Sequence, residues 1–261
     1  MIDVHCHLAD NKFKVDVNEV IKRAVESGVS KMVAVAEFGS QFEHVWQLSK
    51  KFEGVVYAGI GVHPIQKRNK GVKHKHFVEM ETFLTRYQQN NVVCVGEIGL
   101  DHTLTQFKLS EEDLKEQEEV FIAQIRLAKQ FGLPINVHSR SAARRTLEVL
   151  KSEQVPPNST VLHAFDGTID DVKMGLEAGH LFSIPPSFQN SERATEMIDT
   201  IPLSNLLLET DSPALSSIKG QRNEPNNLGI CARIIGEVKH IEMERVIEVT
   251  SENAHRLFNF V

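Results

Sequence analysis

Short apolar segments rich in β-branched residues recur along the chain, and stretches of helical spacing lie between them. Eight of these segments are predicted to be β-strands: Ile2–His5, Lys31–Ala36, Val55–Val62, Val92–Glu97, Ile135–His138, Thr160–His163, His180–Ile184 and Asn205–Glu209. Their nearly continuous apolar character is typical of strands covered on both faces, as in a parallel sheet. About eight strand–helix units predict an α/β fold, a TIM (β/α)8 barrel forming a single domain over residues 1–261.

The intervening segments carry helix signals. Asp16–Ser27 has an apolar stripe and is followed by the stop residue Gly28. A second helix is predicted to begin at the capping residue Ser110, with acidic residues in its first turn, and to end before Gly132. A doubly wound open sheet is the structural alternative, but that fold carries a glycine-rich phosphate loop after its first strand. No such loop follows the first predicted strand here, which favours the barrel.

Charge and cysteine content limit the setting of the protein. The net charge of −6 argues against general coating of nucleic acid, although a local basic cleft is compatible with it. Three scattered cysteines are too few for a disulfide framework and indicate a reducing compartment, the cytosol or nucleus. No apolar run reaches the ~18 residues of a membrane span, and no leader is visible. We therefore expect an intracellular protein that is not secreted and has no membrane contact.

Residues of metal-binding type lie where the predicted strands end. In a TIM barrel this end of the strands carries the active site. The residues are His5, His7, His63, Glu97, His138, His163 and Asp211. A single histidine at a strand end is more often a hydrogen-bonded structural residue than a ligand. Because all seven are expected at one pole of the barrel, the set predicts a metal centre.

The spacing and chemistry of these residues favour two cations. His5 and His7 are two residues apart, so both point to one face of a strand, while Cys6 points away and is expected to be buried. Nitrogen and carboxylate ligands without thiolates suit zinc, manganese or magnesium. With His63 set aside, four histidines and two carboxylates remain, which is more than the four ligands that one tetrahedral site uses. Two divalent cations ~3.5–4 Å apart, bridged by Glu97, are the economical arrangement.

Seven ordered motifs resemble a known family. "DVHCHL", "GVHP", "VGEIGLD", "NVHSR", "LHAFDG", "LLLETDSP" and "RNEP" are similar to the motifs of the TatD family of metal-dependent deoxyribonucleases, over residues 2 to about 258. The resemblance implies a barrel of the metal-dependent hydrolase type. It also implies magnesium-dependent DNA hydrolysis, often exonucleolytic from the 3′ end, and family crystals commonly contain zinc. By the family pattern, one metal is held by His5, His7, Glu97 and Asp211, and the second by Glu97, His138 and His163.

On this basis the expected reaction is hydrolysis of a DNA phosphodiester by a hydroxide that bridges two Mg²⁺ or Mn²⁺ ions. Asp211 is expected to act as ligand and proton acceptor, Glu97 as the bridge, and His63 to contact the scissile phosphate or its attacking water. Arg140 and Arg222, on loops of the same rim, are expected to bind phosphate. The expected partner is a DNA strand end or a short single-stranded stretch, bound by a monomer without an obligate protein partner.

Several rim residues leave two interpretations open. His102 replaces the usual aromatic residue after "GLD", and it is either a phosphate donor or a loop histidine without function. Phe165 and Phe188 are either base-stacking residues or core residues. The basic stretch 67–76, "KRNKGVKHKH", either guides a DNA backbone or is a solvated, mobile loop.

Two functional alternatives remain at this stage. One is a metal-dependent hydrolase of the same architecture that acts on another phosphodiester or on C–N or ester bonds. Many such enzymes bridge their metals with a modified lysine at the end of the fourth strand, where this chain has Glu97, and this favours the phosphodiesterase. The other alternative is a non-catalytic barrel used as a binding scaffold, against which the intact ligand set argues.

Overall fold

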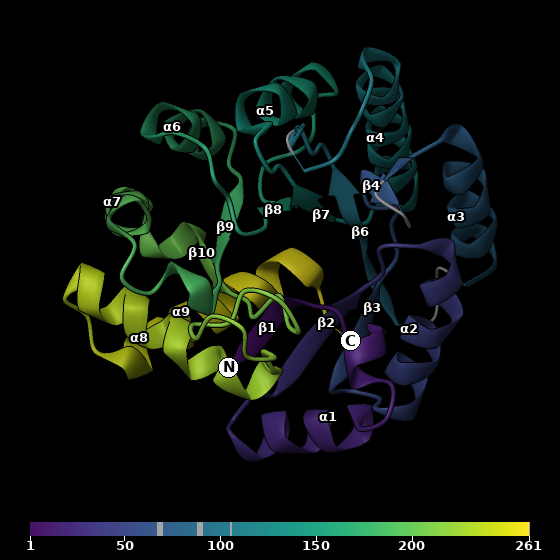
Figure 1. The fold of residues 1–261 in the computed structure, drawn as a ribbon. Coiled ribbons are helices and arrows are strands. Elements are labelled where there is room, and N and C mark those ends of the chain that lie inside the picture. Colours follow the sequence, from purple (N-terminus) through teal and green to yellow (C-terminus); the bar gives the residue numbers. More distant parts are fainter. Residues whose placement is uncertain (67–69, 88–90, 105, 261) are drawn as a thin grey trace.

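The computed structural model describes residues 1–66, 70–87, 91–104 and 106–260. Eight parallel strands form a barrel, and helices surround it (Figure 1). In sheet order the strands are β1 (Ile2–Cys6), β2 (Lys31–Val35), β3 (Val56–Gly59), β6 (Val92–Gly99), β7 (Ile135–His138), β8 (Thr160–Leu162), β9 (Leu181–Ile184) and β10 (Leu206–Leu208). The predicted TIM-barrel architecture and its eight strands are confirmed.

The barrel closes at the seam between β10 and β1. The backbone N–H of Asp211 donates to the carbonyl of His5 (2.9 Å), and the N–H of His7 donates to the carbonyl of Ser212 (2.7 Å). The buried carboxyl of Asp3 accepts from the backbone N–H of Thr210 at 3.0 Å. The residues immediately after β10 therefore join the last strand to the first.

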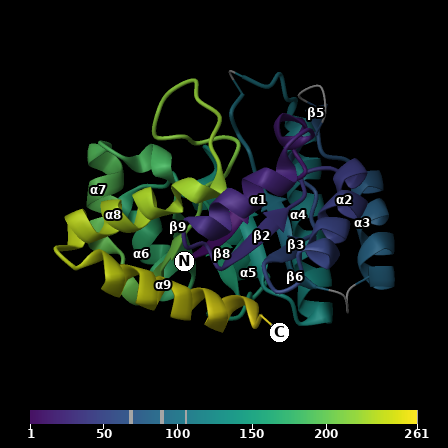
Figure 2. The same ribbon diagram turned by 90° about the horizontal axis from the view of Figure 1, so that it is seen from below.

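Nine α-helices of the described chain lie outside the barrel. They are α1 (Val17–Glu26), α2 (Gly39–Lys51), α3 (His74–Tyr87), α4 (Glu111–Phe131), α5 (Ala143–Ser152), α6 (Ile169–Glu177), α7 (Glu192–Thr200), α8 (Leu228–Lys239) and α9 (Met243–Phe258). Helices α1 to α8 lie around the barrel, and α9 lies across one end (Figure 1, Figure 2). In the side view of Figure 2, α9 lies along the lower end of the barrel, while the loops after β6 and β10 project at the upper end. Leu257 and Phe258 of α9 pack against the interior residues Ile2, Val4 and Leu207. This helix closes the barrel opposite the predicted site. None of the described helices has the length and apolar character to cross a bilayer.

The α1 and α4 predictions agree with the structure. Ser110 caps α4 by accepting from the N–H of Asp113 at 3.1 Å, and Gly132 ends it in a left-handed conformation. Gly132 has φ +65°, which glycine adopts without the steric cost that a Cβ would add.

The segment after β3 differs from its prediction as a loop. A small hairpin of β4 (Ile65–Gln66) and β5 (Lys70–Gly71) precedes α3, which begins at His74. Within the basic stretch, residues 67–69 lie outside the described residues. Lys73 is not solvated freely, because its ammonium lies 2.8 Å from both Asp113 and Glu116 of α4. Acidic residues distant in sequence therefore order this part of the stretch.

Candidate active site

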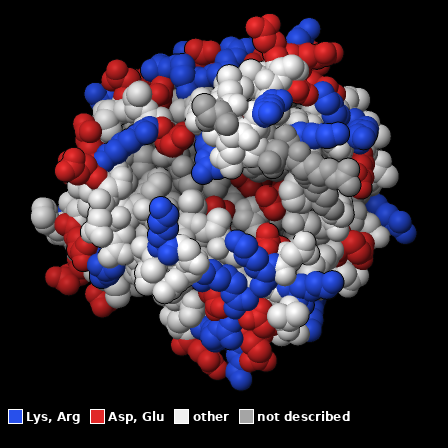
Figure 3. Space-filling view, in the orientation of Figure 1, with Lys and Arg blue, Asp and Glu red and all other residues white. Residues whose placement is uncertain are grey.

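A cleft of about 700 Å³ opens at the carboxyl ends of the strands. On the face shown in Figure 3, acidic side chains lie in the floor of a central hollow and basic side chains lie around it. Six of the seven predicted metal-centre residues line this cleft: His7, His63, Glu97, His138, His163 and Asp211. The seventh, His5, lies beneath them with no exposed surface.

Two strands that carry these residues contain an irregular register. Between Asp3 and Cys6, β1 has one more residue than the facing part of β2, and β6 likewise gains a residue over β7 between Val95 and Ile98. A bulge of this kind redirects the side chains that follow it. It lets Ile2 and Val4 seal the barrel interior while His5 and His7 turn into the site. Glu97 lies in the irregular part of β6, inside the strand and not at the end that the sequence suggested.

Cys6 lies on the other face, as the two-residue spacing of the histidines predicted. It is fully buried among residues of the barrel–helix layer, and its thiol donates to the carbonyl of Val33 at 3.5 Å. Burial raises the pKa of this thiol well above its usual value. The cysteine is therefore a packing residue, and the metal-ligand groups of the described chain do not include it.

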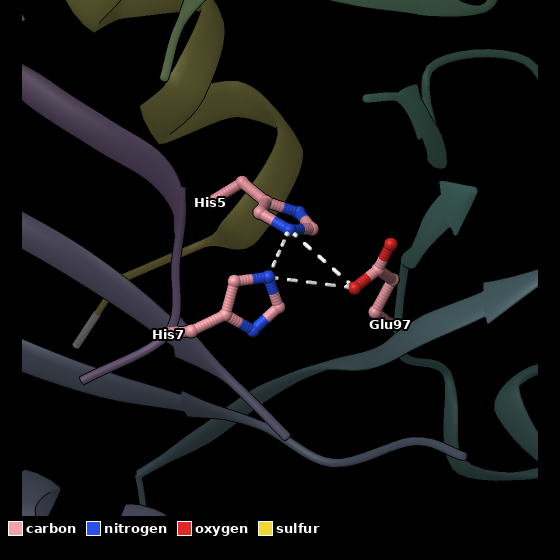
Figure 4. A group of neighbouring side chains, drawn as sticks. All are labelled: His5, His7 and Glu97. Carbon is pink, nitrogen blue, oxygen red and sulfur yellow. Dashed lines mark hydrogen bonds and ion pairs between the residues drawn. The ribbon is translucent and has the colours of Figure 1, made fainter. Parts of the chain in front are cut away.

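The Glu97 carboxylate lies between two sets of histidines. Its Oε2 is 3.6 Å from Nε2 of both His5 and His7 (Figure 4). Its Oε1 is 2.8 Å from Nδ1 of His138 and 3.1 Å from Nε2 of His163. Each oxygen of one carboxylate thus faces its own set of nitrogen ligands.

Asp211 and His63 complete the two sets. Asp211 Oδ1 lies 3.0 Å from Nε2 of His7 and 3.4 Å from Nε2 of His5. His63 Nε2 lies 3.7 Å from Glu97 Oε1, on the side of His138. Ligand atoms of His5, His7 and Glu97 lie within 4.8 Å of one another, as do those of His63, Glu97 and His138. The family pattern places His163 in the second set, and His63 is an additional neighbour of that set.

Residues behind the histidines orient their rings. Nδ1 of His5 lies 2.8 Å from the Oδ1 of Asn136, whose amide nitrogen donates to the carbonyl of Val4. With its side-chain oxygen as acceptor, Asn136 holds the proton of His5 on Nδ1, and the Nε2 lone pair faces Glu97.

Acidic residues lie behind three further histidines. Glu209 Oε2 is 3.4 Å from Nδ1 of His163, Asp101 Oδ2 is 3.0 Å from Nε2 of His138, and Glu37 Oε2 is 4.0 Å from Nδ1 of His7. Sequence reasoning missed these residues and Asn136. The available signal was their position: each lies within a predicted strand or just beyond the end of one.

The charges of the centre are strongly coupled. Burial opposes ionisation of Glu97 and Asp211, but the surrounding histidines outweigh it and hold both carboxyl pKa values well below the usual range. Burial likewise opposes protonation of His7, yet Glu37, Asp211 and Glu97 raise its pKa to about 10. The Nε2 atoms of His5 and His7 lie only 3.2 Å apart. Such a group requires positive charge among its nitrogens, from protons or from divalent cations, and this donor set fits cations.

Comparison with known proteins identifies the family. The sequence model of the TatD related DNase family matches residues 2–259. The chain belongs to the TatD-related DNase family. It is 40% identical to human "Deoxyribonuclease TATDN3" over 262 residues, which cover 99% of this chain and 94% of the human protein. It is 31% identical to the "Uncharacterized metal-dependent hydrolase YabD" of Bacillus subtilis, over 99% of this chain and 98% of that protein.

Solved structures agree with this assignment. The TatD homologue YJJV of Escherichia coli superposes with a TM-score of 0.88 at 26% identity, covering 99% of this chain and 98% of that one. The phosphotriesterase homology protein of Escherichia coli, at a TM-score of 0.70 and 16% identity over 98% of each chain, shares the barrel fold. This TatD-family chain is therefore a metal-dependent hydrolase of ester bonds.

Of the two arginines predicted to bind phosphate, only one lines the cleft. Arg140 lines the cleft and is exposed. Arg222 does not line it: its guanidinium is bound by Asp16 (2.7 and 2.9 Å) and lies over the ring of Phe13. Glu224 binds the same guanidinium. A direct phosphate contact from Arg222 in the catalytic cleft has no support in this geometry, because both terminal nitrogens already bind Lys12, Asp16 and Glu224.

The structure also bears on the two interpretations offered for each of Phe165, Phe188 and His102. Phe165 is 1% exposed and packs edge-on against Phe182, so it is a core residue and unavailable for base stacking. Phe188 lines the cleft and keeps that possibility. His102 is absent from the described lining of the cleft, and its backbone N–H donates to the carbonyl of Arg140. A phosphate contact from His102 is therefore not supported.

Proposed function

We propose that this protein is a deoxyribonuclease that removes nucleotides from the 3′ end of a DNA strand with two divalent cations per subunit. The single observation that carries the proposal is the position of Glu97, whose two oxygens face separate sets of nitrogen ligands. One carboxylate shared in this way is the arrangement expected of a two-metal phosphodiesterase.

The donor set fits two hard or borderline cations. His5, His7, Asp211 and Glu97 would hold the first, and Glu97, His138 and His163 the second. Bound Mg²⁺ or Mn²⁺ supplies Lewis acidity toward water and the phosphodiester. Every ligand of both sets comes from one chain, which supports a monomer. The three cysteines are free and buried, which supports a reducing compartment inside the cell.

The residues of the chain have separable tasks in this proposal. Asp211 lines the cleft, and nearby histidines lower its carboxyl pKa, so it is ionised at neutral pH. We assign to it the proton of the attacking water because it is an ionised carboxylate that faces the cleft. Arg140 presents its guanidinium to a non-bridging phosphate oxygen. His63 faces the same cleft beside the scissile phosphate. Burial lowers the pKa of His63, so its ring is neutral at neutral pH.

The volume of the cleft supports action at a strand end. About 700 Å³ lies within the range of pockets that hold small ligands, and corresponds to roughly one or two nucleotides. The acidic floor requires cations before a phosphate can enter, since like charges repel.

The test is cleavage of single- and double-stranded DNA labelled at the 3′ or 5′ end. Protein stripped of metal should be inactive, and Mg²⁺ or Mn²⁺ should restore stepwise release from the 3′ end. Glu97→Gln should lower kcat at least ~10³-fold and the matched surface variant Glu244→Gln should not, since Glu244 is an exposed residue of α9. Metal-independent cleavage, or full activity of Glu97→Gln, would exclude the two-metal nuclease.

A further inference from the structure

A second groove of about 580 Å³ adjoins the catalytic cleft. The groove lies beneath the 213–222 loop, which begins two residues after Asp211. Both cavities share the same four lining residues, Lys12, Pro213, Ala214 and Leu215. Phe188 lines the cleft, and its neighbour Ser187 lines the groove. The two cavities therefore lie side by side along these residues.

The two cavities differ in charge. Besides its four histidines, the described lining of the cleft contains six carboxylate residues, one lysine and one arginine: Asp10, Glu37, Glu97, Asp101, Asp166 and Asp211 against Lys12 and Arg140. The described lining of the groove contains Lys12, Lys219 and Arg222, and its other members are uncharged. The cleft is suited to cations, and the groove is suited to an anion that extends away from them.

The base of the loop is held in place. The N–H of Asn223 donates to the carbonyl of Pro213 at 3.2 Å, which closes the loop, and the Asn223 amide donates to the carbonyl of Thr210. Arg222 ties this base to the first loop of the barrel through Asp16 and the carbonyl of Lys12. Both ends of the loop that lines the groove are therefore anchored to the barrel.

The loop leaves one cation available near its tip. Lys219 is exposed, and its ammonium has no ion-pair partner within the described part of the chain. By contrast, the charge of Arg222 is matched by Asp16 and Glu224. Ile218, beside Lys219, is 55% exposed. An unpaired ammonium next to an exposed apolar side chain offers a phosphate contact and a surface for a base or sugar.

We propose that this groove binds the single DNA strand on the far side of the scissile phosphate, with Lys219 contacting a backbone phosphate. The inference rests on the proposed nuclease function and adds a site outside the metal centre. A volume of about 580 Å³ holds roughly one or two nucleotides and is too small for a double helix. Arg222 acts as a positioning residue for the loop.

The experiment compares two substrates that differ in reach. A p-nitrophenyl ester of thymidine 5′-phosphate occupies the cleft alone, whereas oligonucleotides of two to about six residues extend into the groove. For each variant, kcat/KM for the longer oligonucleotides is divided by kcat/KM for the ester. Relative to the wild type, this quotient should fall ~10-fold in Lys219→Glu and ~3-fold in Lys219→Gln, chiefly because KM for the oligonucleotides rises. The magnitude of the salt slope of log KM should decrease by about 0.7, the value for one lost single-strand phosphate contact. Lys50→Glu, at the far end of α2, is the matched control.

The outcomes separate this inference from the nuclease proposal. The groove proposal would be overturned if Lys219→Glu lowered kcat/KM equally for the ester and the oligonucleotides. It would also be overturned if the oligonucleotide-to-ester ratio of kcat/KM were the same in Lys219→Glu and Lys50→Glu. If the wild type hydrolyses neither substrate, the nuclease proposal fails. Fluorescence anisotropy with a labelled tetranucleotide then tests whether the groove binds single-stranded DNA. Affinity weakened ~10-fold by Lys219→Glu supports the groove proposal. Affinity unchanged by the substitution, or no binding by the wild type, refutes it.

Discussion

Nδ1 of His5 lies 2.8 Å from Oδ1 of Asn136, and both side chains are fully buried. This contact joins β1 to β7 and fixes which nitrogen of His5 faces the metal centre. Replacing Asn136 with alanine should lower the affinity for the first cation about 10–100-fold, because the ring loses its orientation. Isothermal titration of Mn²⁺ into metal-free protein measures this. Asn18→Ala, at an exposed site, is the control, and equal affinities in the two variants would contradict the proposed role.

Glu209 offers a test of the second cation. Glu209→Gln keeps an oxygen for the backbone N–H of Ala164 but removes the negative charge behind His163. We expect affinity for the second cation to fall about 10–100-fold, and affinity for the first to fall less. Titration should then show one tight Mn²⁺ ion in place of two. Two ions bound with wild-type affinity would show that Glu209 serves packing alone.

Removal of metal should change how stability depends on pH. The pKa of His7 is raised to about 10 in the folded protein, against about 6.5 when unfolded. The extra proton affinity of His7 in the folded state therefore adds its full contribution to the free energy of unfolding below pH ~6.5. This contribution is lost as pH rises toward 10. Asp3, whose carboxyl pKa burial raises to about 8, acts in the same direction.

The free energy of unfolding of metal-free protein should therefore fall between about pH 7 and pH 9, on the order of 1 kcal/mol per pH unit. Metal-loaded protein should show a smaller fall, because cations compete with protons for the histidine nitrogens while Asp3, which is not a ligand, keeps its own contribution below about pH 8. Urea unfolding at several pH values, with and without Mn²⁺, measures both trends. A parallel pH dependence in the two states would contradict the assignment of these histidines as ligands.

Cys6→Ala tests the face assignment of β1. The thiol lies in the barrel–helix layer, so its loss should cost about 1 kcal/mol of stability and leave the bound metal unchanged. Metal content measured by mass spectrometry, together with thermal unfolding, separates the two effects. A loss of metal in a folded variant would place Cys6 in the centre after all.

The strands, and the meeting of the metal-binding residue types at one rim, were predictable because both follow from local patterns. Continuous apolar runs indicate buried parallel strands, and polar residues at their ends must meet at one rim. The position of Glu97 inside β6 was not predictable, since its register irregularity depends on pairing with β7. The order of the basic stretch was missed for a similar reason: Lys73 is paired with Asp113 and Glu116, which are far away in sequence.

The sequence also did not predict the roles of side chains that act through a partner on another strand or helix. Glu209 and Asn136 look like ordinary strand residues until the fold places them behind His163 and His5. Arg222 shows the opposite case. Its place in the rim loop after the last strand predicted a phosphate contact, but Asp16 and Glu224 bind its guanidinium. A sequence pattern indicates which groups reach the rim, whereas their availability depends on neighbours that only the fold supplies.

The seam of the barrel has a consequence during synthesis of the protein. His5 and His7 are made about 200 residues before Asp211, whose backbone N–H donates to the His5 carbonyl. A nascent or truncated chain that lacks Asp211 has an open ring and an incomplete ligand set. Fragments released by early termination or by cleavage within the barrel therefore lack a complete metal-binding group, which forms only when the ring is closed.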